Sequence, residues 1–72
     1  ASLHQSLAVT TAKGQRVTVM LDIVPDEENP TATLTAVDEG GDELAQVRTS
    51  PGFKLNRASA TNWADGGFQK PR

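Results

Sequence analysis

Alternation of apolar and polar residues is the clearest signal in the sequence, and it is strongest over Arg16–Val24. The apolar side chains at every second position are Val17, Val19, Leu21 and Ile23. A period of two with many β-branched residues predicts a β-strand. Met20 and Val24 make the other side of this strand partly apolar as well. A strand that is apolar on both sides is typically central or covered, so we expect a lid over Met20 and Val24.

Three further segments carry a similar pattern and are separated by turn-forming residues. The expected strands are Gln5–Thr11, Thr31–Val37 and Glu43–Thr49, with Phe53–Leu55 as a short fifth strand. The expected turns and loops are Ala12–Gln15, Pro25–Pro30, Asp38–Asp42 and Ser50–Gly52. Strands at this regular spacing predict an all-β fold, a small antiparallel sandwich or barrel of four to five strands.

The pattern changes in the C-terminal part of the chain. Ala58–Ala64 lacks alternation and predicts one or two helical turns, which Gly66 or Gly67 would end. We expect residues 68–72 to form an extended basic tail. The predicted organisation is therefore an N-terminal arm at residues 1–4, a β-rich domain at 5–56, and a helical turn with its tail at 57–72.

Composition adds a second expectation, because the apolar core available to this chain is thin. The 72 residues are 36% hydrophobic, and nine of those hydrophobic residues are alanine. A domain of this size buries a smaller share of its unfolded surface than a larger domain does, and it is marginally stable. Two interpretations stay open: a small compact centre with loosely held ends, or a subunit that completes its core against a partner.

Charge is distributed unevenly along the chain, although the net charge is only −2. Residues 22–43 hold eight acidic residues and no Lys or Arg, whereas residues 44–72 hold five basic residues and one acid. Two explanations fit this uneven distribution of charge equally well. Either the acidic loops serve only to keep a small sheet soluble, or acidic and basic regions make complementary contacts between copies or partners. The sequence does not decide whether the acidic loops share one end of the sheet.

The inventory of reactive side chains argues against an enzyme. Cys and Tyr are absent and His4 is the only histidine, so general acid–base, thiolate and zinc chemistry have few candidate residues. No nucleotide-binding or catalytic motif indicates a cofactor or a small-molecule substrate. A calcium site shared by the acidic loops is a minor alternative, and solvated acidic turns are our main expectation.

The N-terminus lacks the pattern of a signal peptide, and no apolar run reaches the length of a membrane span. We therefore expect no membrane partner, and we favour cytoplasmic synthesis or a place in a virus particle. The first residue, Ala1, is compatible with removal of an initiator methionine.

The function that these features favour is a non-enzymatic structural or protein-interaction module. Its most concrete form is an accessory or decoration subunit of a larger assembly, such as a virus particle or a multi-subunit complex, whose partner is another protein or further copies of itself. Candidate partner-binding residues are the C-terminal Trp63, Phe68, Lys70 and Arg72, followed by Phe53, Glu27, Glu28 and Glu39. Trp63 and Phe68 are favoured because aromatic anchors contribute strongly to interfaces.

Binding of single-stranded nucleic acid is the alternative function. A small β-barrel can stack bases on aromatic rings beside basic residues, and the aromatic residues of this chain all lie in its basic C-terminal part. The negative net charge argues against this alternative, because nucleic-acid binders usually present a basic surface. Packing in the core or as a lid over the sheet is our main expectation for each of these rings.

Overall fold

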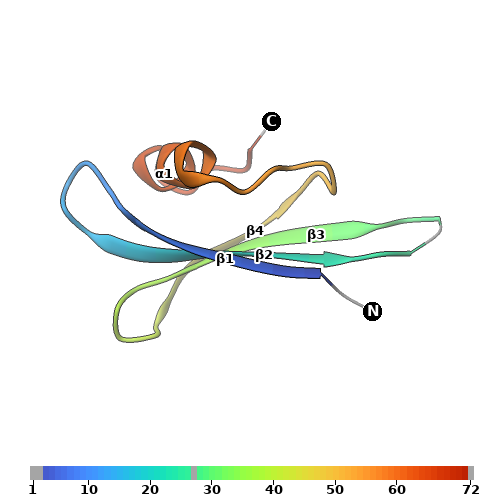
Figure 1. Cartoon of the computed structure of the whole chain (residues 1–72), viewed down its shortest axis with the longest axis horizontal. Helices are drawn as coiled ribbons and strands as arrows, with labels where there is room; N and C mark the ends of the chain where they lie inside the picture. Colours follow the sequence, from blue (N-terminus) through green and yellow to red (C-terminus); the bar gives the residue numbers. More distant parts are fainter. Residues whose placement is uncertain (1–2, 27, 72) are drawn as a thin grey trace.

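The computed structural model describes residues 3–26 and 28–71, which form one open antiparallel sheet and one helix. The strands are β1 (Leu3–Thr10), β2 (Arg16–Val24), β3 (Thr31–Val37) and β4 (Glu43–Thr49), and the helix is α1 (Arg57–Asp65). Strand order in the sheet is β1-β2-β3-β4, so each strand pairs with its neighbour in sequence (Figure 1). The mostly β, antiparallel character is as predicted, but the described strands form a single open sheet, and closure into a sandwich or barrel is not shown.

Tight turns join the strands where the sequence places glycine. Gly14 and Gly41 have φ values of 86° each, a region that residues with a side chain rarely adopt. In the β3–β4 turn, Asp38 Oδ1 accepts hydrogen bonds from the backbone N–H groups of Gly40 and Asp42. These local bonds satisfy the turn backbone and explain why the sequence predicts the two hairpins.

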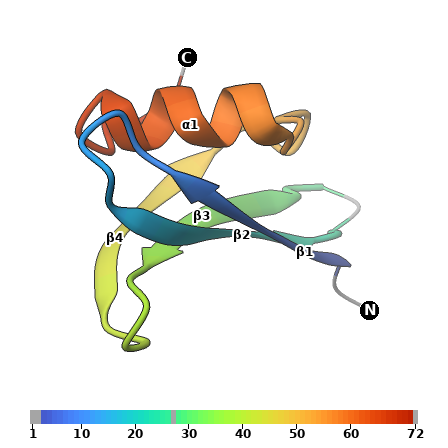
Figure 2. The same ribbon diagram turned by 60° about the vertical axis from the view of Figure 1, so that its left-hand side comes forward.

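One face of the sheet forms the core, and α1 lies against this face (Figure 2). Side chains on a strand alternate between the two faces, which places the odd-numbered apolar residues of β2 together on the helix side. The largest fully buried side chains are Val17, Val19, Leu21 and Leu34. Ala60 and Trp63 of α1 belong to the same buried cluster.

Local hydrogen bonds fix the start of α1. Asn56 has an extended backbone conformation, and its side chain accepts a hydrogen bond from Ser59 N at 2.9 Å. Ser59 Oγ in turn accepts from Asn56 N at 3.0 Å, which completes a capping box. Gly66 follows the helix as its C-cap, and Gly67 has a φ of 79°, so the glycine stop is confirmed.

Four details differ from the expectations. β1 begins at Leu3, so Leu3 and His4 belong to the sheet and not to an arm, because both pair with β2 residues. Phe53–Leu55 forms no strand, since after the turn at residues 50–52 the chain leaves the sheet to reach α1. The helix is longer by one residue at each end than the predicted residues 58–64.

The fourth difference is the side of the sheet that is covered. The helix covers the Val17–Val19–Leu21 side and not the side of Met20 and Val24. Val24 stays 50% exposed. The reason is volume: the β-branched and leucine side chains of the first set form the larger apolar surface and gain most from burial.

We expect the substitution Trp63→Ala to lower the free energy of unfolding by about 3–5 kcal/mol, because it empties a large core position. Trp63→Phe retains a ring and removes an unpaired indole N–H, so its loss should be clearly smaller. Urea denaturation followed by circular dichroism measures both. Leu44→Ala at a 36% exposed position is the control, and equal losses for Leu44→Ala and Trp63→Ala would contradict the assignment of Trp63 to the core.

We also expect Asn56→Ala to cost about 0.5–2 kcal/mol, because it removes the side-chain acceptor of the capping box. Asn29→Ala in the exposed β2–β3 loop is a matched control, and it should change the midpoint of the same denaturation experiment little. A loss for Asn56→Ala no larger than for Asn29→Ala would show that the cap is not formed in solution.

Candidate functional site

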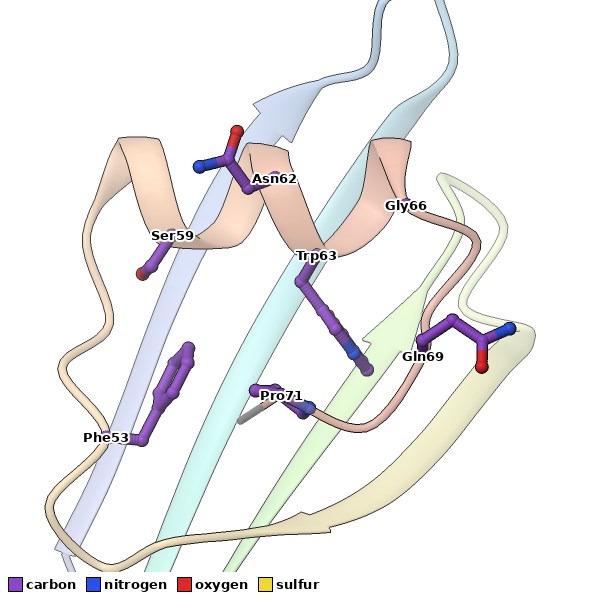
Figure 3. Close-up of a pocket in the computed structure, with 7 residues that line it drawn as sticks. All are labelled: Phe53, Ser59, Asn62, Trp63, Gly66, Gln69 and Pro71. Atoms are coloured by element: carbon purple, nitrogen blue, oxygen red, sulfur yellow. The ribbon is translucent and has the colours of Figure 1, made fainter.

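Among the residues that the structure describes, a pocket beside α1 and the uncovered face of the sheet offer surfaces for a ligand or partner. The pocket has a volume of about 330 Å³ and lies between α1, the β4–α1 connection and the C-terminal residues (Figure 3). It is lined by Phe53, Ser59, Asn62, Trp63, Gly66, Gln69 and Pro71. Its apolar walls come mainly from Phe53, Trp63 and Pro71, which are drawn from three separate segments.

Trp63 and Phe68, the aromatic residues predicted to contact a partner, are used here to pack the protein itself. Trp63 is only 6% exposed, and its ring meets that of Phe68 edge-on, with centroids 5.0 Å apart. Trp63 Nε1 is buried without a hydrogen-bond partner among the described residues. The geometry therefore places Trp63 beneath the surface, where its first role is to hold the helix on the sheet.

Phe68 owes its position to an unusual backbone conformation. Its φ of 61° lies in the left-handed region, which costs a residue with a side chain roughly 1 kcal/mol or more. Phe68 N donates to Trp63 O at 3.0 Å, so the chain turns back directly after the helix. The contact between the two rings offsets the strain and keeps the following residues beside α1.

The remaining predicted residues that the structure describes do not converge on one site. Lys70 is exposed, Phe53 is half-buried in the pocket wall, and Glu28 lies in the exposed β2–β3 loop. Glu39 lies in the β3–β4 turn at the opposite end of the sheet (Figure 1). Glu27 and Arg72 are outside the described residues. The two acidic loops thus lie at opposite ends of the sheet, so the hypothesis of a calcium site shared by both loops is wrong.

Within residues 3–26 and 28–71, no group of three or more His, Asp or Glu side chains is placed to hold a metal ion. Glu39 forms one long ion pair, between its Oε1 and Arg16 Nε at 3.9 Å, and both side chains are highly exposed. Such exposed pairs contribute little to stability.

The second surface, which sequence reasoning missed, is the face of the sheet opposite α1. In the described part of the chain no helix or strand covers it, as Figure 2 shows. We call it the open face. Register places three cross-strand rows on it: Ala8–Thr18–Val37–Glu43, Ser6–Met20–Thr35–Gln46 and His4–Asp22–Thr33–Arg48. The signal that could have revealed it is the same alternation that identified the strands.

The middle of the open face carries no charge. We define the charge-free centre as the first two of these rows without Glu43, which ends the first row on β4: Ser6, Ala8, Thr18, Met20, Thr35, Val37 and Gln46. Thr35 in its middle is only 7% exposed and accepts a hydrogen bond from Gln46 Nε2 at 3.3 Å. The charge-free centre therefore presents hydroxyl, amide and methyl groups. Contacts with neighbouring side chains hold Thr35 and Gln46 in position.

Charged groups border this centre at both ends of the sheet. At one end, Arg16 and Glu43 begin strands β2 and β4. At the other end, His4 Nδ1 and Asp22 Oδ1 form a hydrogen bond across β1 and β2, and Arg48 lies in the same row. The open face thus has a neutral middle and a charged border.

The β2–β3 loop shows the clearest electrostatic effect in the molecule. Asp26 Oδ1 accepts hydrogen bonds from Glu28 N at 2.9 Å and Asn29 N at 3.3 Å. These bonds stabilise the ionised form and lower the pKa of Asp26, with the Glu28 bond as the larger cause. The carboxylate of Asp26 thus closes the loop through these hydrogen bonds, and the loop does not require a bound cation to hold its shape.

We expect a carbon-detected NMR titration to place the pKa of Asp26 below the ordinary aspartate value of about 3.9. Because the pKa is lowered in the folded state, the stabilisation is present above the unfolded-state pKa and is lost as pH falls through the folded-state value. The amide signals of Glu28 and Asn29 should shift over that same acidic range. A midpoint at or above the ordinary value would contradict the hydrogen-bonded loop.

Comparison of the chain with models of protein families, with curated proteins and with solved structures found no match in any of the three. No helix within residues 3–26 and 28–71 combines the length and the apolar character needed to cross a membrane. The open face and the pocket are therefore interpreted from their own chemistry.

Proposed function

We propose that this chain is a protein-interaction module, a subunit of a larger assembly, which binds its partner protein through the open face. The observation that carries the proposal is the charge-free centre with its charged border. The centre of a protein–protein interface is depleted of charged residues, while its rim is polar and accessible to water. The open face has this arrangement, although charged residues make up 22% of the whole chain.

The position of the centre strengthens this interpretation. It extends over all the described strands, from Ser6 on β1 to Gln46 on β4, and therefore offers a continuous surface. Threonine and serine hydroxyls can exchange water for acceptors on a partner, and Met20 can adapt its shape because its side chain is unbranched. A partner surface that is neutral at its middle and charged at its border would fit this face.

The small core is a second supporting feature. On the helix side, four large side chains are fully buried: Val17, Val19, Leu21 and Leu34. A partner that covered the open face would remove further apolar surface from water, including that of Met20 and Val37. Each square ångström of apolar surface removed from water contributes about 25 cal/mol. Binding would thus raise the stability of the module.

The nucleic-acid alternative receives less support from the arrangement. Base stacking needs exposed rings, but Trp63 is buried and Phe68 packs against it. The open face also lacks the excess of basic residues that phosphate binding requires, since Arg16 and Arg48 are balanced by Asp22 and Glu43.

The proposal can be tested by site-specific photo-crosslinking in the cells that produce the chain naturally. A photoreactive residue at Gln46, exposed in the charge-free centre, should give a discrete protein adduct, while the same residue at Ala58, exposed on α1, should not. Thr18→Glu places a charge in the centre and should abolish the Gln46 adduct. Ala58→Glu is the matched charge control and should leave that adduct unchanged.

Equal adducts from Gln46 and Ala58, or a Gln46 adduct that persists in Thr18→Glu, would contradict binding through the open face. The folded state of both variants can be checked by circular dichroism, so that a lost adduct is not mistaken for unfolding.

A further inference from the structure

The two edges of the sheet differ in how they are protected against pairing with another strand. Natural edge strands are usually interrupted by bulges, charges or proline, because a long regular edge is a template for further pairing. β4 has such protection: its pairing with β3 shifts register between Ala36 and Val37, and Glu43 and Arg48 place charges on the strand. β4 is therefore a poor template.

β1 lacks these protective features, a bulge, a proline or an Asp, Glu, Lys or Arg, over Leu3–Thr10. It contains no proline, glycine, Asp, Glu, Lys or Arg, and its register with β2 runs without a shift from the pair Leu3–Ile23 to the pair Thr10–Arg16. No element of the described chain pairs with its outer side. Leu3, at its beginning, is a large apolar residue that is 64% exposed. This edge is long, regular and uncharged apart from His4.

We propose that β1 pairs with β1 of a second copy of this chain, in antiparallel orientation, so that two copies share one continuous sheet. The proposal rests on the proposed function, because it identifies a further copy as one partner of the assembly. A strand can pair with itself about a two-fold axis only if its own sequence tolerates the contact. β1 meets this condition, because self-pairing opposes no like charges of Asp, Glu, Lys or Arg.

Symmetry also restricts the register. An axis perpendicular to the sheet reverses the strand but keeps its faces, so residues that point to the same face must oppose each other. A register centred on Ser6 meets this requirement and uses all residues from Leu3 to Val9. It opposes Leu3 of one copy to Val9 of the other, and Gln5 to Leu7. A register centred on Leu7 is equally long but leaves the exposed Leu3 without a partner.

The helix side favours the same register. α1 packs mainly against β1, and Asp65 Oδ1 accepts a hydrogen bond from Ala12 N, just after β1, at 2.8 Å. The Val9 end of β1 is thus the end near the helix. Leu3 of the second copy would lie beside Val9 and next to α1, where its exposed side chain gains apolar contacts. On the open face the two charge-free centres would join at Ser6.

The test uses the symmetry of this register. Ser6 is exposed on the open face, so Ser6→Lys and Ser6→Glu should each fold, but each would oppose two like charges at the axis. Sedimentation velocity at low salt should show wild-type chain at twice the monomer mass as its concentration is raised. Each variant alone should remain monomeric, with at least a tenfold weaker association, and an equimolar mixture of the two should recover the dimer.

Gln46→Lys is the matched control, because Gln46 lies in the same cross-strand row as Ser6 but on the opposite edge. It should dimerise like the wild type. A wild type that stays monomeric at millimolar concentration would overturn the proposal, as would a dimer that Ser6→Lys leaves intact or that only Gln46→Lys disrupts. None of these results would alter the Gln46 crosslink to a different protein, so failure of the edge pairing is distinguishable from failure of the proposed function.

Discussion

The contact between Trp63 and the sheet holds this fold together. A four-stranded sheet with one apolar face exposed to water would be unstable in a chain of this length. Trp63 and Ala60 cover the centre of that face, and the capping box of Asn56 and Ser59 sets where the helix begins. The hydrogen bond that Ala12 N donates to Asp65 Oδ1 fixes the other end of the helix near the first hairpin. The helix and the sheet thus stabilise each other, and neither has another described element to pack against.

A single helix can cover only one face, and the composition of the other face reflects this. Threonine suits a strand because it is β-branched, and its hydroxyl group tolerates water. The open face can therefore remain exposed in the isolated molecule, while its methyl groups and its lack of central charge make it suitable for a partner. These properties of Thr18, Met20 and Thr35 link the packing of the fold to the proposed function. The aromatic residues of the C-terminal part serve the core.

The sequence allowed the strands and turns to be predicted because their signals are local. Alternation over Arg16–Val24 and the glycines of the hairpins require no knowledge of distant contacts. The covered side of the sheet could not be predicted in this way, because β2 has apolar residues on both sides and the choice depends on how the helix packs. For the same reason the sequence leaves Trp63 open to two interpretations. Its burial follows from a three-dimensional arrangement in which residues 9–21 and 60–63 meet.

The candidate site was only partly accessible from the sequence. The predicted contact residues are aromatic or charged, and the structure separates those that it describes between the core, the pocket wall and opposite ends of the sheet. The charge-free centre cannot be predicted from residue type, because a single serine, threonine or alanine does not indicate a binding site. It becomes visible only when register brings Ser6, Met20, Thr35 and Gln46 into one row.

The order of the strands has a consequence for how the chain folds. Every strand pairs with its neighbour in sequence, so the hairpins need only short loops to close, and such local contacts form quickly. The contact of α1 with β1 is different, since Ala12 and Asp65 are separated by 53 positions. We expect the meander to assemble first and the helix to dock last, joining the first hairpin to the C-terminal part of the chain in the step that makes the folding cooperative.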